Sequence, residues 1–326
     1  MRRLGAGLAA GLFVAAAASA QTAAPNKTET VVVTGQRPEQ DIETVISRFV
    51  DQHAATNRKT GQYMRDDLGP VCPVTVGLPP EFNKFVTTRV VQVAKDAGAK
   101  TDTTGTCAPN IEILFTDQPQ AVVKTLAEKT HGAILGMHFV HEVPRLLQVT
   151  HPIQSWYVSG TRLEDNAITP MTSIGRDGTA VSGDDKTPSV DSAYHNAPDR
   201  VSLGSKLPGR RISSIVNVLI IADMRKVAGG EIGAVADYIA MLALSEPRSL
   251  DQCNELPSIL DLMTDCGTRP KPAGLTDSDV AYLKGLYAAD LGATTNSAQK
   301  ESIENGMEGE LGEHAKPGAK PSGNSN

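Results

Sequence analysis

The sequence predicts an α/β (α+β) fold in which helices pack on a mixed sheet. Between residues 70 and 150, short apolar runs alternate with segments whose apolar residues recur at helical spacing. Further along the chain, Ile212–Asp223 is a strongly apolar run typical of a buried strand, and a helical pattern follows it. The chain has 326 residues, of which only 4% are aromatic. We therefore expect a core built from Val, Leu, Ile and Ala.

The first half of the chain predicts an N-terminal α/β unit over residues 39–159. Its first helix shows apolar residues on one face, at Ile42, Val45, Ile46, Phe49 and Val50. The expected elements that follow are a strand over 71–76, a helix over 82–94 that ends at Gly98, a strand over 111–115, a helix from Asp117 and Pro119, and a strand over 133–140.

The second half starts after a segment of different composition. Residues 160–210 are rich in Gly, Ser, Thr, Asp and Pro, which predicts a mobile insertion loop. A C-terminal half over 211–291 follows, and its expected elements are a strand over 212–223, a helix over 231–244 and short helices near 257–264 and 277–289. Residues 292–326 show no apolar periodicity and are predicted to be a disordered tail.

Residues 1–20 have the pattern of a secretory signal peptide. Two arginines precede a short apolar stretch, which ends in the small residues Ala18-Ser19-Ala20. We expect cleavage near Ala20, a linker over residues 21–38 and a mature protein that is periplasmic or secreted.

Charge and hydropathy exclude two classes of partner. The chain has 31 Lys and Arg against 37 Asp and Glu, a net charge of −6, and without Arg2 and Arg3 the balance is 29 − 37 = −8. Nucleic acids and anionic membranes attract clustered cations, so we expect no nucleic-acid partner. After residue 20 no apolar run approaches the roughly 18–20 residues of a membrane span, which argues against an integral membrane protein.

The four cysteines all lie after the predicted leader, and their even number in an oxidising compartment predicts two disulfides. Three pairings are possible. We favour Cys72–Cys107 with Cys253–Cys266 because each pair closes a modest loop, and each bond then contributes about 3–4 kcal/mol. Free buried thiols are the alternative.

Residues 212–288 resemble the catalytic half of metzincin zinc proteases, most closely the matrixins. Leu275–Tyr287 is similar to the closing helix of matrixins, in which a leucine is followed by acids and later by Leu-Tyr. Pro257–Met263 is similar to the Ser-x-x-Leu-Met run that carries the Met-turn, which places Met263 at the Met-turn position. The resemblance implies a zincin-like scaffold over about a quarter of the chain.

The same resemblance implies that the zinc site has been lost. In the family, the preceding helix carries H-E-x-x-H-x-x-G-x-x-H, with two histidines on one face and a glutamate as general base. Here Ala236 and Ala240 fall at the first two ligand positions, Asp237 at the general base and Glu246 at the third ligand. Because zinc hydrolases use about three protein ligands plus water, we expect no catalytic residues, metal or cofactor here.

Asp237 is the exception on an otherwise apolar helix. A buried carboxylate is costly unless it is paired, so we expect a structural ion pair with Arg210, Arg211 or Arg225. A functional role for Asp237 stays open at this point, as does an unrelated α/β domain with an ordinary buried helix.

Histidines offer a second place for chemistry. His138, His141 and His151, with His131 nearby, form the densest group and are a weak alternative metal site. On a strand, however, two residues three apart point to opposite faces, which favours exposed histidines without a metal. His53 lies in a polar context and is given no role, and the chain has no G-x-S-x-G elbow.

These observations predict an exported, non-catalytic protein that resembles a metallopeptidase without its active site. We expect it to act as a binding or envelope module whose partner is an unknown protein or envelope component. The alternative is an active secreted hydrolase or metallopeptidase with an atypical site. A third possibility is an interaction module whose long loop folds on a partner.

Overall fold

The computed structural model describes residues 42–56, 63, 65, 69–102, 104–136, 142–163, 211–289 and 295–314. The chain divides into two compact units, residues 1–39 and 40–326, and every described residue belongs to the second. The predicted leader, its cleavage point, the linker and nearly all of the predicted insertion loop lie outside the described residues.

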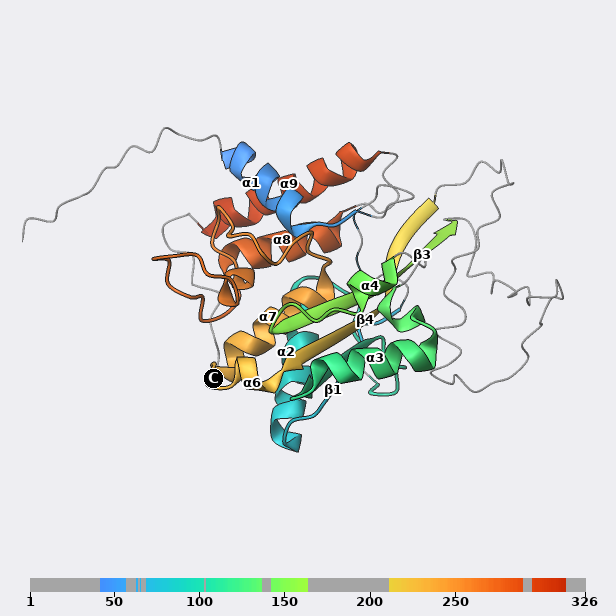
Figure 1. The fold of residues 1–326 in the computed structure, drawn as a ribbon. Helices are drawn as coiled ribbons and strands as arrows, with labels where there is room; N and C mark the ends of the chain where they lie inside the picture. The colour runs from blue at the N-terminus through green and yellow to red at the C-terminus, as the bar shows by residue number, and fades with distance from the viewer. Residues whose placement is uncertain are drawn as a thin grey trace, which may run out of the picture. The chain divides into compact units, whose positions relative to one another are not determined.

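A mixed four-stranded sheet forms the centre of the described unit (Figure 1). Its strands are β1 (Pro73–Val76), β2 (Ile111–Thr116), β3 (Ile153–Leu163) and β4 (Arg211–Asp223). The order is β1-β2-β4-β3, in which β1, β2 and β4 run parallel and β3 pairs antiparallel with β4. The predicted α/β class with a mixed sheet is therefore confirmed. Because β4 lies between β2 and β3, the two predicted halves of the chain share one sheet.

Helices cover both faces of this sheet. On one face, α2 (Pro80–Asp96) and α7 (Ile232–Leu244) pack against the larger core, in which β2 and β4 bury Ile113, Phe115, Val218 and Ile220. On the other face lie α3 (Pro119–Thr130), the 3-10 helix η1 (Ala133–Leu135) and the short α4 (Val143–Leu146). The short α6 (Met224–Val227) follows β4.

Three further helices and a 3-10 helix pack beside α7. They are α1 (Ile42–His53), η3 (Ile259–Leu262), α8 (Asp277–Ala288) and α9 (Asn296–His314). Figure 1 shows α1, α8 and α9 together at the top of the view. A Cβ atom on Gly306 of α9 would lie 2.8 Å from the Cα atom of Gly285 in α8, so both positions need glycine for this close contact.

Part of the predicted disordered tail, residues 296–314, is instead helix α9. Residues 296–314 are helical, and Ile303 and Met307 are fully buried against the core. The prediction failed because the helix buries few apolar side chains and gains its remaining contact from the glycine pair and from Gln299, whose side chain bonds the backbone of Tyr63 in both directions. The tail beyond residue 314 lies outside the described residues.

One strand prediction and one loop prediction are corrected, and residues 137–140 of the predicted strand 133–140 lie outside the described residues. Residues 133–135 form η1 instead of a strand, because Gly132 and Gly136 on either side have φ of 77° and 65°. A Cβ atom on Gly136 would lie 2.0 Å from the Tyr157 carbonyl oxygen, so only glycine allows this approach to β3. Residues 160–163 of the predicted loop continue β3 and pair with the start of β4, Gly160 opposite Ser214.

Both favoured disulfides are present. Cys72–Cys107 ties the start of β1 to the segment before β2, with 6.1 Å between the Cα atoms. Cys253–Cys266 closes a loop between α7 and α8, with 5.7 Å between the Cα atoms. The two disulfides are compatible with an extracellular or periplasmic location. Among the described helices, none is both long and apolar enough to cross a membrane.

Candidate functional site

Helix α7 carries the positions at which the metzincin resemblance places a zinc site. From Ala234 to Leu244 every residue is buried, and Ala236 and Ala240 are completely inaccessible. Methyl groups fill the space at both ligand positions, where they pack in the larger core. The face of α7 that carries these positions therefore lies inside the protein and lines no open cleft.

Asp237 is buried, and its carboxylate joins three parts of the chain. The Arg89 guanidinium of α2 donates to both carboxylate oxygens, through Nε to Oδ1 and through Nη2 to Oδ2 at 3.1 Å. The backbone N–H of Leu275, just before α8, donates to Oδ2 at 2.9 Å. This carboxylate raises the pKa of the Arg89 guanidinium. Asp237 is a structural tie between α2, α7 and the segment before α8.

The partner of Asp237 differs from the three arginines predicted from the sequence. Arg225 pairs with Asp223 at the end of β4, where Nη2 lies 3.1 Å from Oδ2. Arg210 and the side chain of Arg211 lie outside the described residues. Arg89 stands 148 residues before Asp237, so only the packing of α2 on α7 brings the two together.

The two other predicted positions lie near α7. The Glu246 backbone carbonyl accepts from the Ala55 N–H at 2.7 Å, which fixes the segment after α7 to the segment after α1. Met263 ends η3 and packs, partly buried, against the larger core. Among the described residues, no group of three His, Cys, Asp or Glu side chains is arranged to hold a metal ion.

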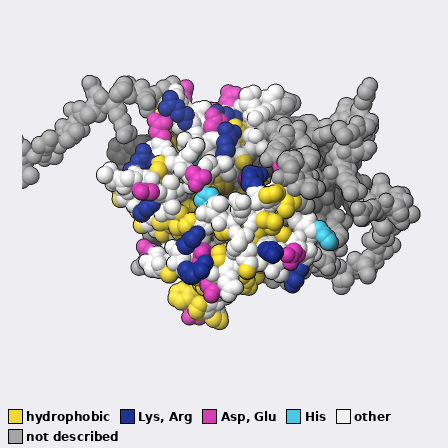
Figure 2. All heavy atoms as spheres, in the orientation of Figure 1, with side chains coloured by type: hydrophobic (Ala, Val, Ile, Leu, Met, Phe, Trp, Pro, Cys, Tyr) yellow, Lys and Arg dark blue, Asp and Glu magenta, His cyan; other side chains and the backbone are white. Residues whose placement is uncertain are grey.

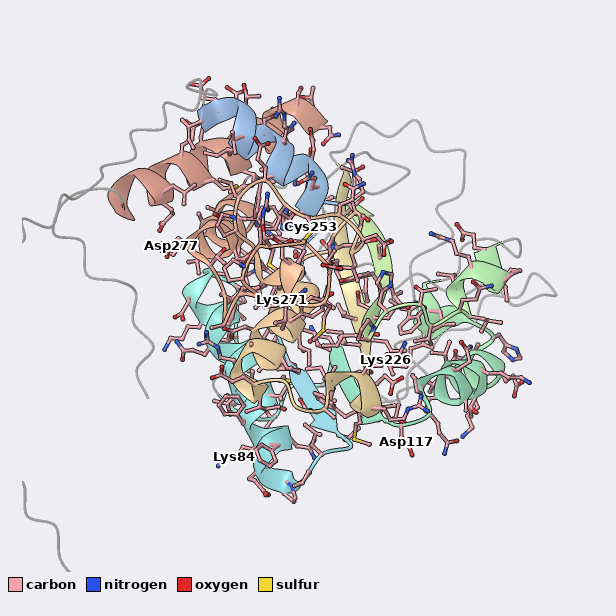
Figure 3. All side chains as sticks on the ribbon, turned by 60° about the vertical axis from the view of Figure 1, so that its left-hand side comes forward. Lys84, Asp117, Lys226, Cys253, Lys271 and Asp277 are labelled. Carbon is pink, nitrogen blue, oxygen red and sulfur yellow. A yellow bond between two sulfur atoms is a disulfide. The ribbon has the colours of Figure 1, made fainter. Side chains whose placement is uncertain are left out.

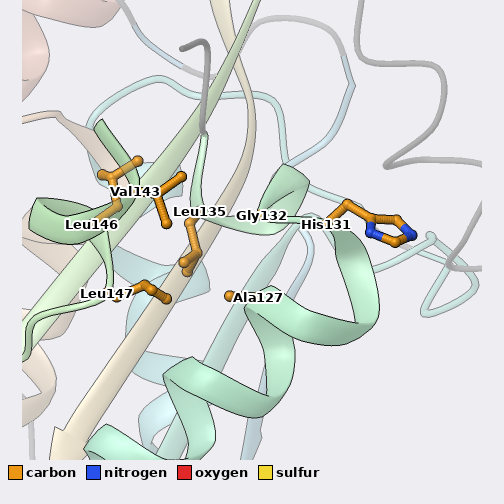
Figure 4. A pocket seen from close by; sticks show the side chains of 7 residues that line it. All are labelled: Ala127, His131, Gly132, Leu135, Val143, Leu146 and Leu147. Atoms are coloured by element: carbon orange, nitrogen blue, oxygen red, sulfur yellow. The ribbon is translucent and has the colours of Figure 1, made fainter. Parts of the chain in front are cut away.

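The predicted histidine group is described only in part. His138 and His141 lie outside the described residues. His151 Nε2 lies 2.9 Å from an Asp251 carboxylate oxygen, so this histidine contacts the loop after α7. His131 ends α3 in the left-handed region, with φ of 51°. It lines a mostly apolar hollow between α3, η1 and α4, with Ala127, Gly132, Leu135, Val143, Leu146 and Leu147 (Figure 4).

A buried group of catalytic side-chain types occurs elsewhere, between α1, η3 and α8. His53 Nε2 lies 3.0 Å from Ser258 Oγ, and Ser258 Oγ lies 2.7 Å from Asp279 Oδ1. All three residues are at most 1% exposed. Burial lowers the pKa of His53 to about 4 and raises the pKa of Asp279 to about 6.

This group is arranged differently from a Ser-His-Asp triad. In a triad the histidine stands between the serine and the acid, which orients its ring. Here the serine stands in the middle, and Asp279 also accepts from the backbone N–H groups of Ile259 and Thr276. A buried serine in this order has no access to a substrate. The group therefore fastens α1 to η3 and α8.

Two sequence patterns indicate this buried group. His53 continues the apolar stripe of α1, three residues after Val50 and four after Phe49, and its ring stacks on Phe49 at 3.7 Å. Thr276 and Asp279 have the spacing of a capping box, which the structure forms at the start of α8.

The carboxyl ends of the parallel strands carry both charged and exposed apolar side chains. Asp117 follows β2 and Lys226 belongs to α6 after β4, and both side chains are labelled in Figure 3. At the same edge, Val76 at the end of β1 and Phe82 and Phe85 on α2 are more than 40% exposed. Figure 2 shows hydrophobic side chains gathered where Figure 1 shows the lower end of α2.

Comparison of the chain with protein-family models, with curated proteins and with solved structures finds no match.

Proposed function

We propose that this protein is an exported, non-catalytic pseudo-metallopeptidase that acts by binding a protein or envelope component. One observation carries the proposal. At the position where the metzincin resemblance puts the general base, Asp237 has both carboxylate oxygens occupied by Arg89 and by the Leu275 N–H. A carboxylate held in this way is not available to take a proton from a bound water.

The surroundings of Asp237 support the same proposal. Ala236 and Ala240 offer no lone pair to a metal, and their inaccessibility leaves no space for a substrate beside them. The exposed side chains of Val76, Phe82 and Phe85 offer apolar contact area of the kind that protein partners use. The two disulfides suit an oxidising compartment outside the cytoplasm.

A hydrolysis assay tests the loss of activity. Purified protein is incubated with a panel of peptide and ester substrates, with and without a zinc chelator. We expect no chelator-sensitive hydrolysis, and the same result for Asp237→Asn. Chelator-sensitive hydrolysis that Asp237→Asn abolishes would contradict the proposal. Hydrolysis that survives Asp237→Asn but is lost in His138→Ala or His141→Ala would favour an enzyme with an atypical histidine site.

Photo-crosslinking tests the binding role. A photoreactive residue in place of Phe85 is compared with one in place of the exposed Lys124 on α3, on the opposite face of the sheet. We expect a discrete adduct with one component from position 85 and none from position 124. Equal labelling from both positions would show that the exposed phenylalanine has no specific partner.

A further inference from the structure

The hydrogen bonds of the buried group around Ser258 determine where its protons stand. His53 Nδ1 lies 2.9 Å from the backbone oxygen of Phe49. A carbonyl oxygen only accepts, so Nδ1 carries a hydrogen and donates it. If the ring is neutral, its Nε2 has no hydrogen and must accept from Ser258.

Ser258 Oγ has three partners and a single hydrogen. The Leu260 N–H donates to it at 3.1 Å, and the other two contacts are His53 Nε2 and Asp279 Oδ1. The hydroxyl can donate to only one of these two. The other contact is a hydrogen bond only when His53 or Asp279 brings a proton of its own, because all three side chains are at most 1% exposed and are shut off from bulk solvent.

The pair therefore holds one proton more than a neutral histidine and an ionised acid together. Burial disfavours charge on both groups, and it lowers the pKa of His53 and raises that of Asp279. Oδ2 of Asp279 accepts the N–H groups of Ile259 and Thr276 and also the Thr276 hydroxyl at 2.9 Å. A proton on Oδ2 would compete with these donors, so Oδ1 is left to carry the proton toward Ser258. These contacts place the proton on Asp279.

We propose that Asp279 is a neutral carboxylic acid in the folded protein, that it donates its proton to Ser258, and that Ser258 in turn donates to His53. This chain of hydrogen bonds, the relay, holds α1 against η3 and α8 in a pH-dependent way and so acts as a lock between them. The lock is complete while the pair holds a single proton. If the pair gains a second proton, His53, Asp279 and the Leu260 N–H all donate to Ser258 Oγ, which has only two lone pairs. If the pair loses its proton, either the His53 or the Asp279 contact has no hydrogen and is no longer a hydrogen bond.

Ionisable groups on the elements packed around the relay include Tyr282 of α8, Asp261 of η3, Asp51 of α1 and Lys300 of α9. The Tyr282 hydroxyl donates to the His53 backbone oxygen at 3.2 Å. Burial, and then the charges of Tyr63, Tyr287 and Glu246, raise the pKa of Tyr282. Asp51 pairs with Lys300 at 2.8 Å, and Asp261 accepts from Asn254 at 2.8 Å. Among the described residues, the pKa of His53 is shifted by burial and then by the Phe49 carbonyl, and by no charged side chain.

The two end groups give opposite pH dependences. Asp279, with its pKa raised from 3.8 to about 6, contributes stability that is present below pH 3.8 and lost as the pH rises through about 6. His53, with its pKa lowered from 6.5 to about 4, contributes stability that is present above pH 6.5 and lost as the pH falls through about 4. Between about pH 4 and 6 the two effects oppose each other, so docking of α1 in the native protein changes little with pH.

Hydrogen exchange of the α1 amides, corrected for the intrinsic exchange rate, tests the relay. Asp279→Asn supplies a permanent N–H donor to Ser258 and leaves only the His53 effect. We expect α1 opening in this variant to increase about tenfold per unit as the pH falls from 6.5 to 4. His53→Gln leaves only the Asp279 effect, and opening should increase about tenfold per unit as the pH rises from 4 to 6. Asp277→Asn, exposed on the same turn of α8, is the matched control and should keep the flat native profile.

Slopes of the same sign in the two variants, or flat profiles in both, would overturn the relay. A measurement on the unaltered protein covers the case in which a variant fails to fold. With ¹⁵N-labelled histidine, the His53 ring at pH 5 should be neutral, with its hydrogen on Nδ1 and a bare Nε2. An imidazolium at pH 5, or a hydrogen on Nε2 alone, would refute the assignment.

Discussion

Replacing Asp237 by alanine removes the acceptor that joins α2, α7 and the segment before α8. Two charge-assisted bonds from Arg89 and one from the Leu275 N–H are lost together. Breaking a buried ion pair costs about 3–5 kcal/mol, because the remaining charge is left buried. The Arg89 side chain is 31% exposed and regains water, so we expect a loss of about 2–4 kcal/mol in the free energy of unfolding.

Urea unfolding of Asp237→Ala, Arg89→Ala and the double variant measures this energy as a cycle. We expect a coupling energy above about 1 kcal/mol between the two residues. Arg48→Ala serves as the control, because Arg48 pairs with Glu255 at 3.2 Å while its side chain is 55% exposed. That variant should cost less than about 1 kcal/mol. If Asp237→Ala is no worse than Arg48→Ala, Asp237 is not the structural tie described here.

Four further variants test the packing and the second disulfide. Gly306→Ala should lower the free energy of unfolding by about 1–3 kcal/mol, because the new methyl group meets the α8 backbone. Gly309→Ala, with open space around it, should raise it by up to about 1 kcal/mol. Equal effects of the two variants in thermal unfolding would show that α9 does not dock on α8. Ala240→Leu should lose about 1–3 kcal/mol in urea unfolding by overpacking, and a neutral result would place Ala240 at the surface. Serine at both Cys253 and Cys266 should cost about 3 kcal/mol in thermal unfolding, and an unchanged midpoint would mean that this loop is already constrained without the bond.

The sequence predicted well the elements whose burial is almost complete. The predicted strand 212–223 and helix 231–244 differ from β4 and α7 by one residue at an end, because α7 is apolar at nearly every position and β4 contains the apolar run 218–222. The disulfides followed from sequence distance, because the entropic cost of bringing two cysteines together is smaller for a short loop such as the one from Cys253 to Cys266. Local patterns were sufficient for these features.

Features that depend on distant residues were not predictable. The Arg89–Asp237 pair needs α2 beside α7, and sequence spacing carries no sign of that contact. Helix α9 gains its packing from Gly306 against Gly285, a contact that apolar periodicity does not register. The polar neighbours of His53 in the sequence favour an exposed side chain, whereas its place on the apolar stripe of α1 indicates burial. In each case the three-dimensional neighbour decides the role.

The zinc content of the purified, dialysed protein tests the central claim most directly. Elemental analysis after equilibration with zinc and removal of the excess should give well below one zinc per chain. The same value is expected for Ala236→Gly, which changes one of the two positions that correspond to zinc ligands. One tightly held zinc per chain, lost on chelation together with a change in stability, would contradict the account of a scaffold in which Asp237 binds Arg89 in place of a catalytic water.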